Sequence, residues 1–273
     1  MRVPASPLAA VAAIGFALAA GVYVVAVIDE AVGRLVTGVP VRPAQLCVLP
    51  ARRAALHFLH GTTTTERPDG PAWALAVASL GALAAGALVV VPLSRTAAVA
   101  DVDDGIVLFG AAMALVMVAV FLHGWSPNSA MPLVGGYRFV AQALSYEMPL
   151  ALVLIAAALP ARSLAVGAIV ESQEGLWNVV RQPLGLPLYL VATTGLAFWG
   201  PLATADAADL GGGTRVESSG SRLLAWKAAR AAVLVAAAAM GAAVFLGGWW
   251  GPVLPAPVWV LLKPVALLAV VIT

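Results

Sequence analysis

GWSPNSAMPLVGGYRFVAQALSYEMPL, residues 124–150, joins a loop to an apolar helix that carries both an arginine and a glutamate. With about 100° of rotation per residue, Arg138 and Gln142 share one face of this helix, whereas Glu147 points to the opposite face. Glu147 also lies about 13 Å further along the helix axis than Arg138. Because the helix is polar on two sides, we expect other helices to surround it.

The composition indicates an integral membrane protein. The chain has 273 residues, of which 62% are hydrophobic and 10% are charged. Soluble domains carry about 25% charged residues, and the mean hydropathy here is +0.98. The single cysteine, Cys47, excludes a disulfide framework and a multi-cysteine metal or cluster site. His57 and His60 have no carboxylate or cysteine beside them, so we expect no metal site.

Hydropathy predicts an all-α polytopic bundle of about seven transmembrane helices within a single domain, residues 1–273. The segments are 8–28, 72–93, 105–123, 139–159, 185–203, 223–247 and 257–273. The first is too long for a signal-peptide core, so we expect a retained helix. The loops after the first, third and fifth segments hold eight arginines, and the other loops hold three. The positive-inside rule therefore predicts an external N-terminus.

The first long loop contains PAQLCVLPARRAALHFLHG, residues 43–61, in which apolar residues surround Arg52 and Arg53. This pattern favours an amphipathic helix that lies on the membrane surface. A solvated basic connection is the alternative.

Ionisable groups inside a bilayer are costly and often mark a pathway. Glu147 is too deep to reach the membrane surface, so it is either a proton-handling group or a buried carboxylic acid that is hydrogen-bonded to a neighbour. Lys227 and Arg230 either reach the cytoplasmic rim or pair with acids across the bundle. The remaining candidate acids lie in expected cytoplasmic loops and are either functional or solvated: Asp29, Glu30, Asp206, Asp209 and Glu217.

The opening stretch closely resembles the signature of the H subunit of respiratory complex I, the quinone-site membrane subunit of the NADH–quinone oxidoreductase. Similar short motifs follow in order, among them IVESQ (169–173), ESSG (217–220) and FLGGW (245–249). The positions that match the signature are Gly124, Trp125, Ser126, Asn128, Ser129, Leu133, Gly135, Arg138, Ala141, Gln142, Ser145, Tyr146, Glu147, Pro149 and Leu150.

This resemblance implies a multi-pass protein of the inner (plasma) membrane that shapes a quinone chamber and links quinone reduction to proton translocation. It implies quinone as a substrate at a subunit interface, no covalently bound cofactor and no metal. The implied partners are other membrane subunits, peripheral iron–sulfur subunits and the lipid bilayer, with no nucleic acid. Glu147, Glu217, Asp209 and Asp206 are the proton-path candidates. The quinone-chamber or interface candidates are Asp29, Glu30, Arg34, Trp125, Asn128, Arg138, Gln142 and Tyr146.

The chain departs from the family pattern at several charged positions. A loop glutamate of the family falls near Gly195, a loop arginine falls near Phe198, and a helix glutamate falls on Arg230. The family also usually has eight helices. The alternatives are therefore the membrane anchor of an energy-converting [NiFe] hydrogenase or formate hydrogenlyase-type complex, a non-coupling scaffold, and an independent transporter. In each complex the chain would not be an enzyme alone.

Overall fold

The computed structural model describes residues 7–40, 43–92, 94, 99–100, 102–207 and 211–273, and all regular elements in these ranges are helices. The first half contains α1 (Pro7–Val36), α2 (Pro43–Leu59), α3 (Gly70–Val89), α4 (Gly105–Trp125) and α5 (Ala130–Ala158). The second half contains the 3₁₀ turn η1 (Leu159–Ala161), α6 (Val166–Glu171), α7 (Asn178–Arg181), α8 (Gly185–Leu196), the 3₁₀ segment η2 (Gly200–Ala205), α9 (Gly220–Phe245) and α10 (Ala256–Ile272).

Six helical stretches among the described residues are long and apolar enough to cross a membrane, which confirms the polytopic all-α class. They contain α1, α3, α4, α5, α8 with η2, and α9. The seventh predicted segment corresponds to α10, an apolar helix of 17 residues. That length lies at the lower end of what a bilayer requires. The orientation of the N-terminus stays a prediction.

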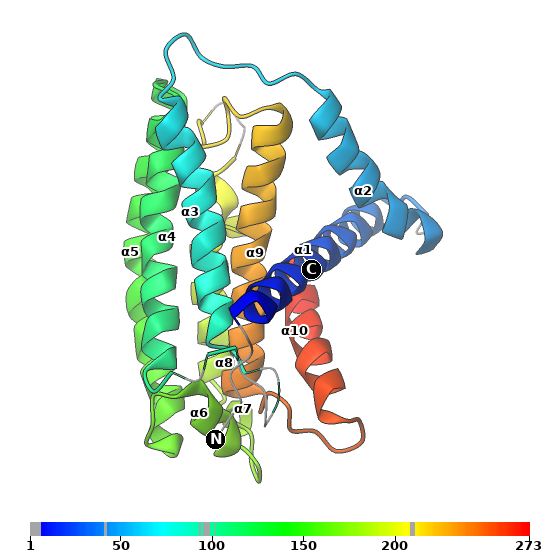
Figure 1. Ribbon diagram of the computed structural model, residues 1–273, viewed down its shortest axis with the longest axis vertical. Coiled ribbons are helices and arrows are strands. Elements are labelled where there is room, and N and C mark those ends of the chain that lie inside the picture. Colours follow the sequence, from blue (N-terminus) through cyan, green and yellow to red (C-terminus); the bar gives the residue numbers. More distant parts are fainter. Residues whose placement is uncertain (1–6, 41–42, 93, 95–98, 101, 208–210) are drawn as a thin grey trace.

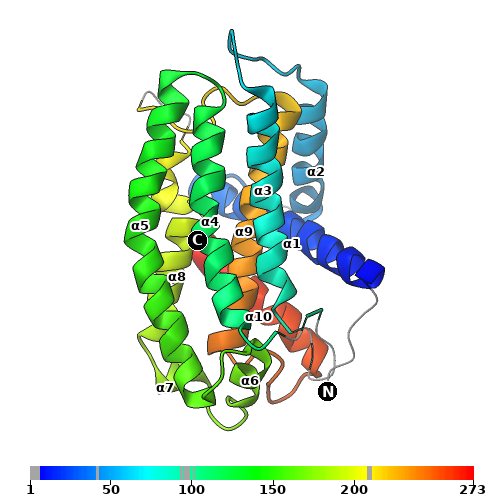
Figure 2. The ribbon, with the colours of Figure 1, turned by 60° about the vertical axis from the view of Figure 1, so that its left-hand side comes forward.

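Helix α9 lies at the centre of the bundle and contacts α3, α10, α1 and α8 (Figure 1). Its sequence from 231 onward, AAVLVAAAAMGAAVF, is dominated by small residues, which let neighbouring helices approach closely. Gly21 of α1 shows this closeness, because a Cβ atom there would lie 2.5 Å from Val235 Cγ1. By contrast, only 6% of the apolar window of α1 is buried, and this helix crosses the bundle obliquely (Figures 1 and 2).

Helix α5 lies at the edge of the bundle (Figure 2), so the expectation that other helices surround it is wrong. It packs mainly against α4 and α8. A third face carries exposed apolar side chains, namely Tyr137, Leu144, Met148, Leu152 and Ile155. The polar side chains Arg138 and Gln142 instead lie beside this apolar stripe and donate hydrogen bonds to α8 and the segment after it. A helix with polar residues on two sides can therefore still leave its third side apolar and exposed.

Candidate functional site

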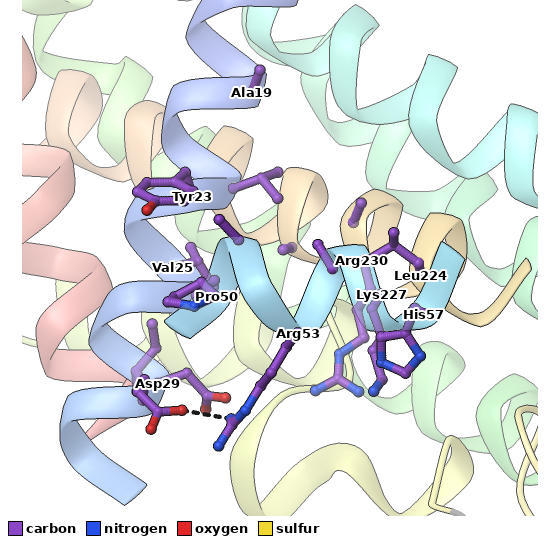
Figure 3. Close-up of a pocket in the computed structure, with 18 of the residues that line it drawn as sticks. Ala19, Tyr23, Val25, Asp29, Pro50, Arg53, His57, Leu224, Lys227 and Arg230 are labelled. Atoms are coloured by element: carbon purple, nitrogen blue, oxygen red, sulfur yellow. Dashed lines mark ion pairs between the residues drawn. The ribbon is translucent and has the colours of Figure 1, made fainter. Parts of the chain in front are cut away.

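A cavity of about 910 Å³ lies between α1, α2, α9 and η2 (Figure 3). The apolar part of its wall includes Val22, Val25, Ala54, Phe58, Leu224 and Ala231. The helix predicted from residues 43–61 is confirmed as α2, and it forms one side of this cavity because it packs against both α1 and α9. Its position on a membrane surface stays a prediction.

Charged side chains gather at one end of the cavity. Glu30, which is 8% exposed, pairs with Arg34 one turn along α1 at 2.9 Å and with Arg53 of α2 at 2.5 Å. Figure 3 shows Arg53 directed toward the end of α1 that carries Asp29. The Glu30–Arg53 pair joins α2 to α1, so it helps to hold the cavity wall together.

Asp206 is not a solvated loop residue, since it is only 1% exposed. Its Oδ2 atom lies 2.7 Å from Nη1 of Arg230 and 3.8 Å from Nε of Arg215. Its Oδ1 atom accepts hydrogen bonds from Thr214 Oγ1 at 2.9 Å and Trp226 Nε1 at 2.8 Å. Arg230 therefore pairs with an acid across the bundle, which was one of the two outcomes expected from the sequence.

The Arg230 guanidinium is also covered by aromatic rings. Its central carbon lies 4.3 Å from the centroid of the Trp199 ring and 5.4 Å from that of Phe198. Phe198 is fully buried with a φ of 42°. Ring faces attract a cation, so the aromatic residues and Asp206 together accommodate the positive charge of Arg230.

Arg138 and Gln142 hold the loop that follows α8. Arg138 Nη1 donates to the Gly212 carbonyl at 2.9 Å. Gln142 Nε2 donates to the carbonyls of Gly195 at 2.6 Å and Leu202 at 2.9 Å. Tyr146 packs on Gly195, where an added Cβ atom would lie 2.5 Å from its ring. These three α5 residues support the segment that contains Asp206 and do not line the cavity.

Gly135 gives the first testable prediction. A Cβ atom there would lie 2.5 Å from Thr214 N and 2.7 Å from Ala205 O, both of which are rigid backbone atoms. Gly135→Ala should therefore push the loop off α5 and lower the free energy of unfolding by about 2 kcal/mol, measured by reversible unfolding in detergent. Gly136→Ala is the matched control, because its nearest atoms lie 3.4 Å or more away. Equal stability of the two variants would contradict this packing.

Among the other sequence candidates, Glu217, Trp125 and Asn128 lie apart from the cavity. Glu217 Oε1 accepts a hydrogen bond from Ser129 Oγ at 3.2 Å. Trp125 is 49% exposed at the end of α4, and exposed Asn128 has a φ of 52° in the turn before α5. Asp209 lies outside the described residues. Of the candidates on α1, Asp29 and Glu30 line the cavity, whereas Arg34 reaches it through its pair with Glu30.

Glu147 is the candidate proton group on α5. Its side chain is partly buried, and its Oε1 atom is buried without a hydrogen-bond partner among the described residues. The alternative expectation, a buried carboxylic acid hydrogen-bonded to a neighbour, therefore finds no partner for this oxygen among the described residues. An unsatisfied buried polar atom is uncommon and calls for an explanation.

The cavity also contains ionisable residues that the sequence analysis did not assign to a site, namely His57, Arg53, Arg215 and Lys227. Burial and then the charge of Lys227 lower the pKa of His57, with a smaller contribution from His60. No motif marks these residues, because they come from three separate segments. The three-residue spacing of Lys227 and Arg230 was the one sequence pattern that could have indicated a shared site, since it places both residues on one side of α9.

Comparisons with known proteins agree with this architecture. The profile of the NADH dehydrogenase family matches residues 54–273. The H subunit of the NADH-quinone oxidoreductase of Syntrophotalea carbinolica is 34% identical over 166 residues, which cover 60% of this chain and 50% of that protein. Two H subunits from strains of Rhodopseudomonas palustris are each 36% identical, over 60% and 63% of this chain and 52% and 54% of their own lengths.

The chain spans about half the length of these curated relatives. The family profile covers both the charged stretch of α5 and the segment from α8 to α9 that holds Asp206 and Arg230. Because this profile matches most of the chain, the protein belongs to the NADH dehydrogenase family.

Proposed function

We propose that this chain is the membrane subunit of a complex-I-like NADH–quinone oxidoreductase and that the cavity between α1, α2 and α9 is its part of the quinone chamber. The chain would link quinone reduction to proton translocation and act only with partner subunits in the inner (plasma) membrane. Family membership and six candidate membrane spans support this proposal.

The cavity itself is the observation that carries the quinone proposal. Two candidate membrane spans, α1 and α9, form part of its wall. Aliphatic side chains along this wall suit an isoprenoid tail, and the polar end suits a head group with two carbonyl oxygens. The loop containing Asp206 borders that end, so a change at the head group has a direct route to α5 through the contacts of Arg138 and Gln142.

A photoreactive quinone analogue tests this assignment. In the complex purified from its membrane, we expect covalent labelling of peptides from α1, α2 and the first turns of α9, and protection by excess native quinone. Labelling confined to the exposed stripe of α5 would contradict the assignment, because that stripe is an apolar surface outside the cavity.

Glu147 is the strongest proton-path candidate, because Asp206 is fixed by an ion pair and two further hydrogen bonds. Glu147→Gln should lower proton translocation per electron by about tenfold while leaving assembly intact. Proton uptake by inverted vesicles, measured against quinone reduction, checks this. Glu174→Gln is the control, since Glu174 is an exposed carboxylate outside the main helices. Unchanged coupling in the Glu147 variant would rule out the relay role.

A second candidate function is that of a non-coupling scaffold or the membrane anchor of an energy-converting hydrogenase-type complex. The Asp206–Arg230 pair favours it, because a guanidinium occupies the position of a family glutamate and neutralises the nearest loop acid. Quinone reduction without proton uptake in the intact complex would support the scaffold, and co-purification with hydrogenase subunits would support the anchor.

A further inference from the structure

The cavity wall holds more positive than negative charge. Four basic side chains line it, namely Arg53, Arg215, Lys227 and Arg230, against the two carboxylates Asp29 and Glu30. Arg53 is paired with Glu30, and Arg230 and Arg215 lie 2.7 and 3.8 Å from Oδ2 of Asp206 behind the wall. The cations contributed by α9 and the loop before it therefore exceed the acids that can neutralise them.

Lys227 is the least satisfied of these cations. It is half-buried and makes no ion pair or hydrogen bond with any residue that the structure describes. The Nε atoms of Arg215 and Arg230 are also buried without a hydrogen-bond partner. Figure 3 shows His57, Lys227 and Arg230 gathered on one side of the cavity. Three cations on this side of the cavity, Arg215, Lys227 and Arg230, share the single carboxylate of Asp206. A bound anion would offset the remaining positive charge.

The neighbouring surface indicates what kind of anion fits. Much of the rest of the wall is apolar, with Ala19, Val22, Ala228 and Ile272 among its aliphatic residues. It is formed in part by two candidate membrane spans, α1 and α9. Basic pockets between membrane helices bind anionic lipid head groups, and each acyl CH₂ that is buried strengthens binding.

We infer that the cavity holds an anionic membrane phospholipid, with its phosphate against Lys227, Arg215 and Arg230 and an acyl chain along the apolar wall. The lipid would occupy the cavity that the quinone proposal also uses, so the two ligands would compete for it. The lipid proposal goes beyond the quinone function and is tested without it, because it requires only residues of this chain. A lipid at this place closes the gap between α1, α2 and α9 from the membrane side.

Native mass spectrometry of the full chain in a neutral detergent tests the site. Phosphatidylglycerol should bind about tenfold more tightly than phosphatidylcholine with the same acyl chains, because the phosphate of phosphatidylcholine is neutralised by its own choline cation and that of phosphatidylglycerol is not. Lys227→Gln should reduce the difference to about twofold, and Lys227→Arg should preserve it. Arg52→Gln is the matched control, because exposed Arg52 is not part of the cavity wall.

The unfolding midpoint of the variant and competition by inorganic phosphate distinguish lipid binding from misfolding and from binding of a free anion. An unchanged unfolding midpoint of Lys227→Gln would show that the loss of lipid comes from the missing ammonium and not from misfolding. Equal retention of both lipids by the unaltered chain would overturn the inference, as would an equal loss in Arg52→Gln. Displacement of phosphatidylglycerol by millimolar inorganic phosphate alone would assign the site to a free anion and overturn the lipid assignment.

Discussion

Arg230→Glu should prevent stable folding of the chain. Arg230 has only 12% of its side chain exposed, and its Nη1 atom lies 2.7 Å from Oδ2 of Asp206. The substitution leaves Asp206 without its main counter-ion and adds a second carboxylate beside it. Breaking one partner of a buried pair costs about 3–5 kcal/mol, and the new repulsion adds to this. The expected observation is loss of folded protein from the membrane fraction and, where any remains, a much lower resistance to unfolding in detergent.

Lys227→Glu is the control for this prediction. It reverses the same charge three residues earlier on the same helix, but Lys227 has no ion-pair or hydrogen-bond partner among the described residues. We therefore expect its stability to change by less than about 1 kcal/mol. If the Arg230→Glu variant were as stable as the unaltered chain, the stability of the fold would not depend on the pairing of Arg230 with Asp206.

Lys263→Met should lower the free energy of unfolding by about 3 kcal/mol. Lys263 of α10 is 5% exposed, and its Nζ atom donates to the carbonyls of Leu246 at 2.5 Å, Gly248 at 2.9 Å and Trp250 at 2.5 Å. These carbonyls follow the end of α9, where a cation stabilises the negative end of the helix dipole. Methionine has a similar volume and no donor, so the three oxygens would lose their shared partner.

Lys263→Gln should be intermediate, because its amide still donates two hydrogen bonds, although from a shorter side chain. Leu261→Ala serves as the surface control, since Leu261 lies on the same helix and is 71% exposed. Unfolding should be followed by the fluorescence of Trp177 and Trp259, whose rings lie 4.3 and 5.3 Å from Nζ. Equal stability of Lys263→Met and the unaltered chain would mean that α10 packs on α9 through apolar contacts alone.

The helical class and most membrane spans were predictable, because hydropathy reports directly on burial in lipid. The helix over residues 43–59 was predictable from a different pattern, because its apolar and basic residues follow the spacing of an amphipathic helix. The edge position of α5 was not, because periodicity shows which residues share a face but not which neighbour covers it. In this case one face of α5 is left uncovered and apolar.

The candidate site was predictable only in part. The signature of residues 124–150 drew attention to Arg138, Gln142 and Tyr146, but their contacts with α8 and the loop after it depend on a fold in which residues 49–74 positions apart meet. The buried state of Asp206 was missed, because its surroundings in sequence are small and polar like those of a solvated loop. The charge of Arg230 could have indicated that Asp206 is buried, since a buried cation requires an acid nearby.

Purification of the tagged chain from its native membrane in mild detergent, with identification of what accompanies it and assay of quinone reduction, tests the central claim most directly. We expect iron–sulfur quinone-module subunits and antiporter-like membrane subunits to accompany the chain, together with quinone reduction that stops when the α1–α2–α9 cavity is labelled. Recovery of the chain without any redox subunit, and with no quinone reduction in the purified fraction, would contradict it.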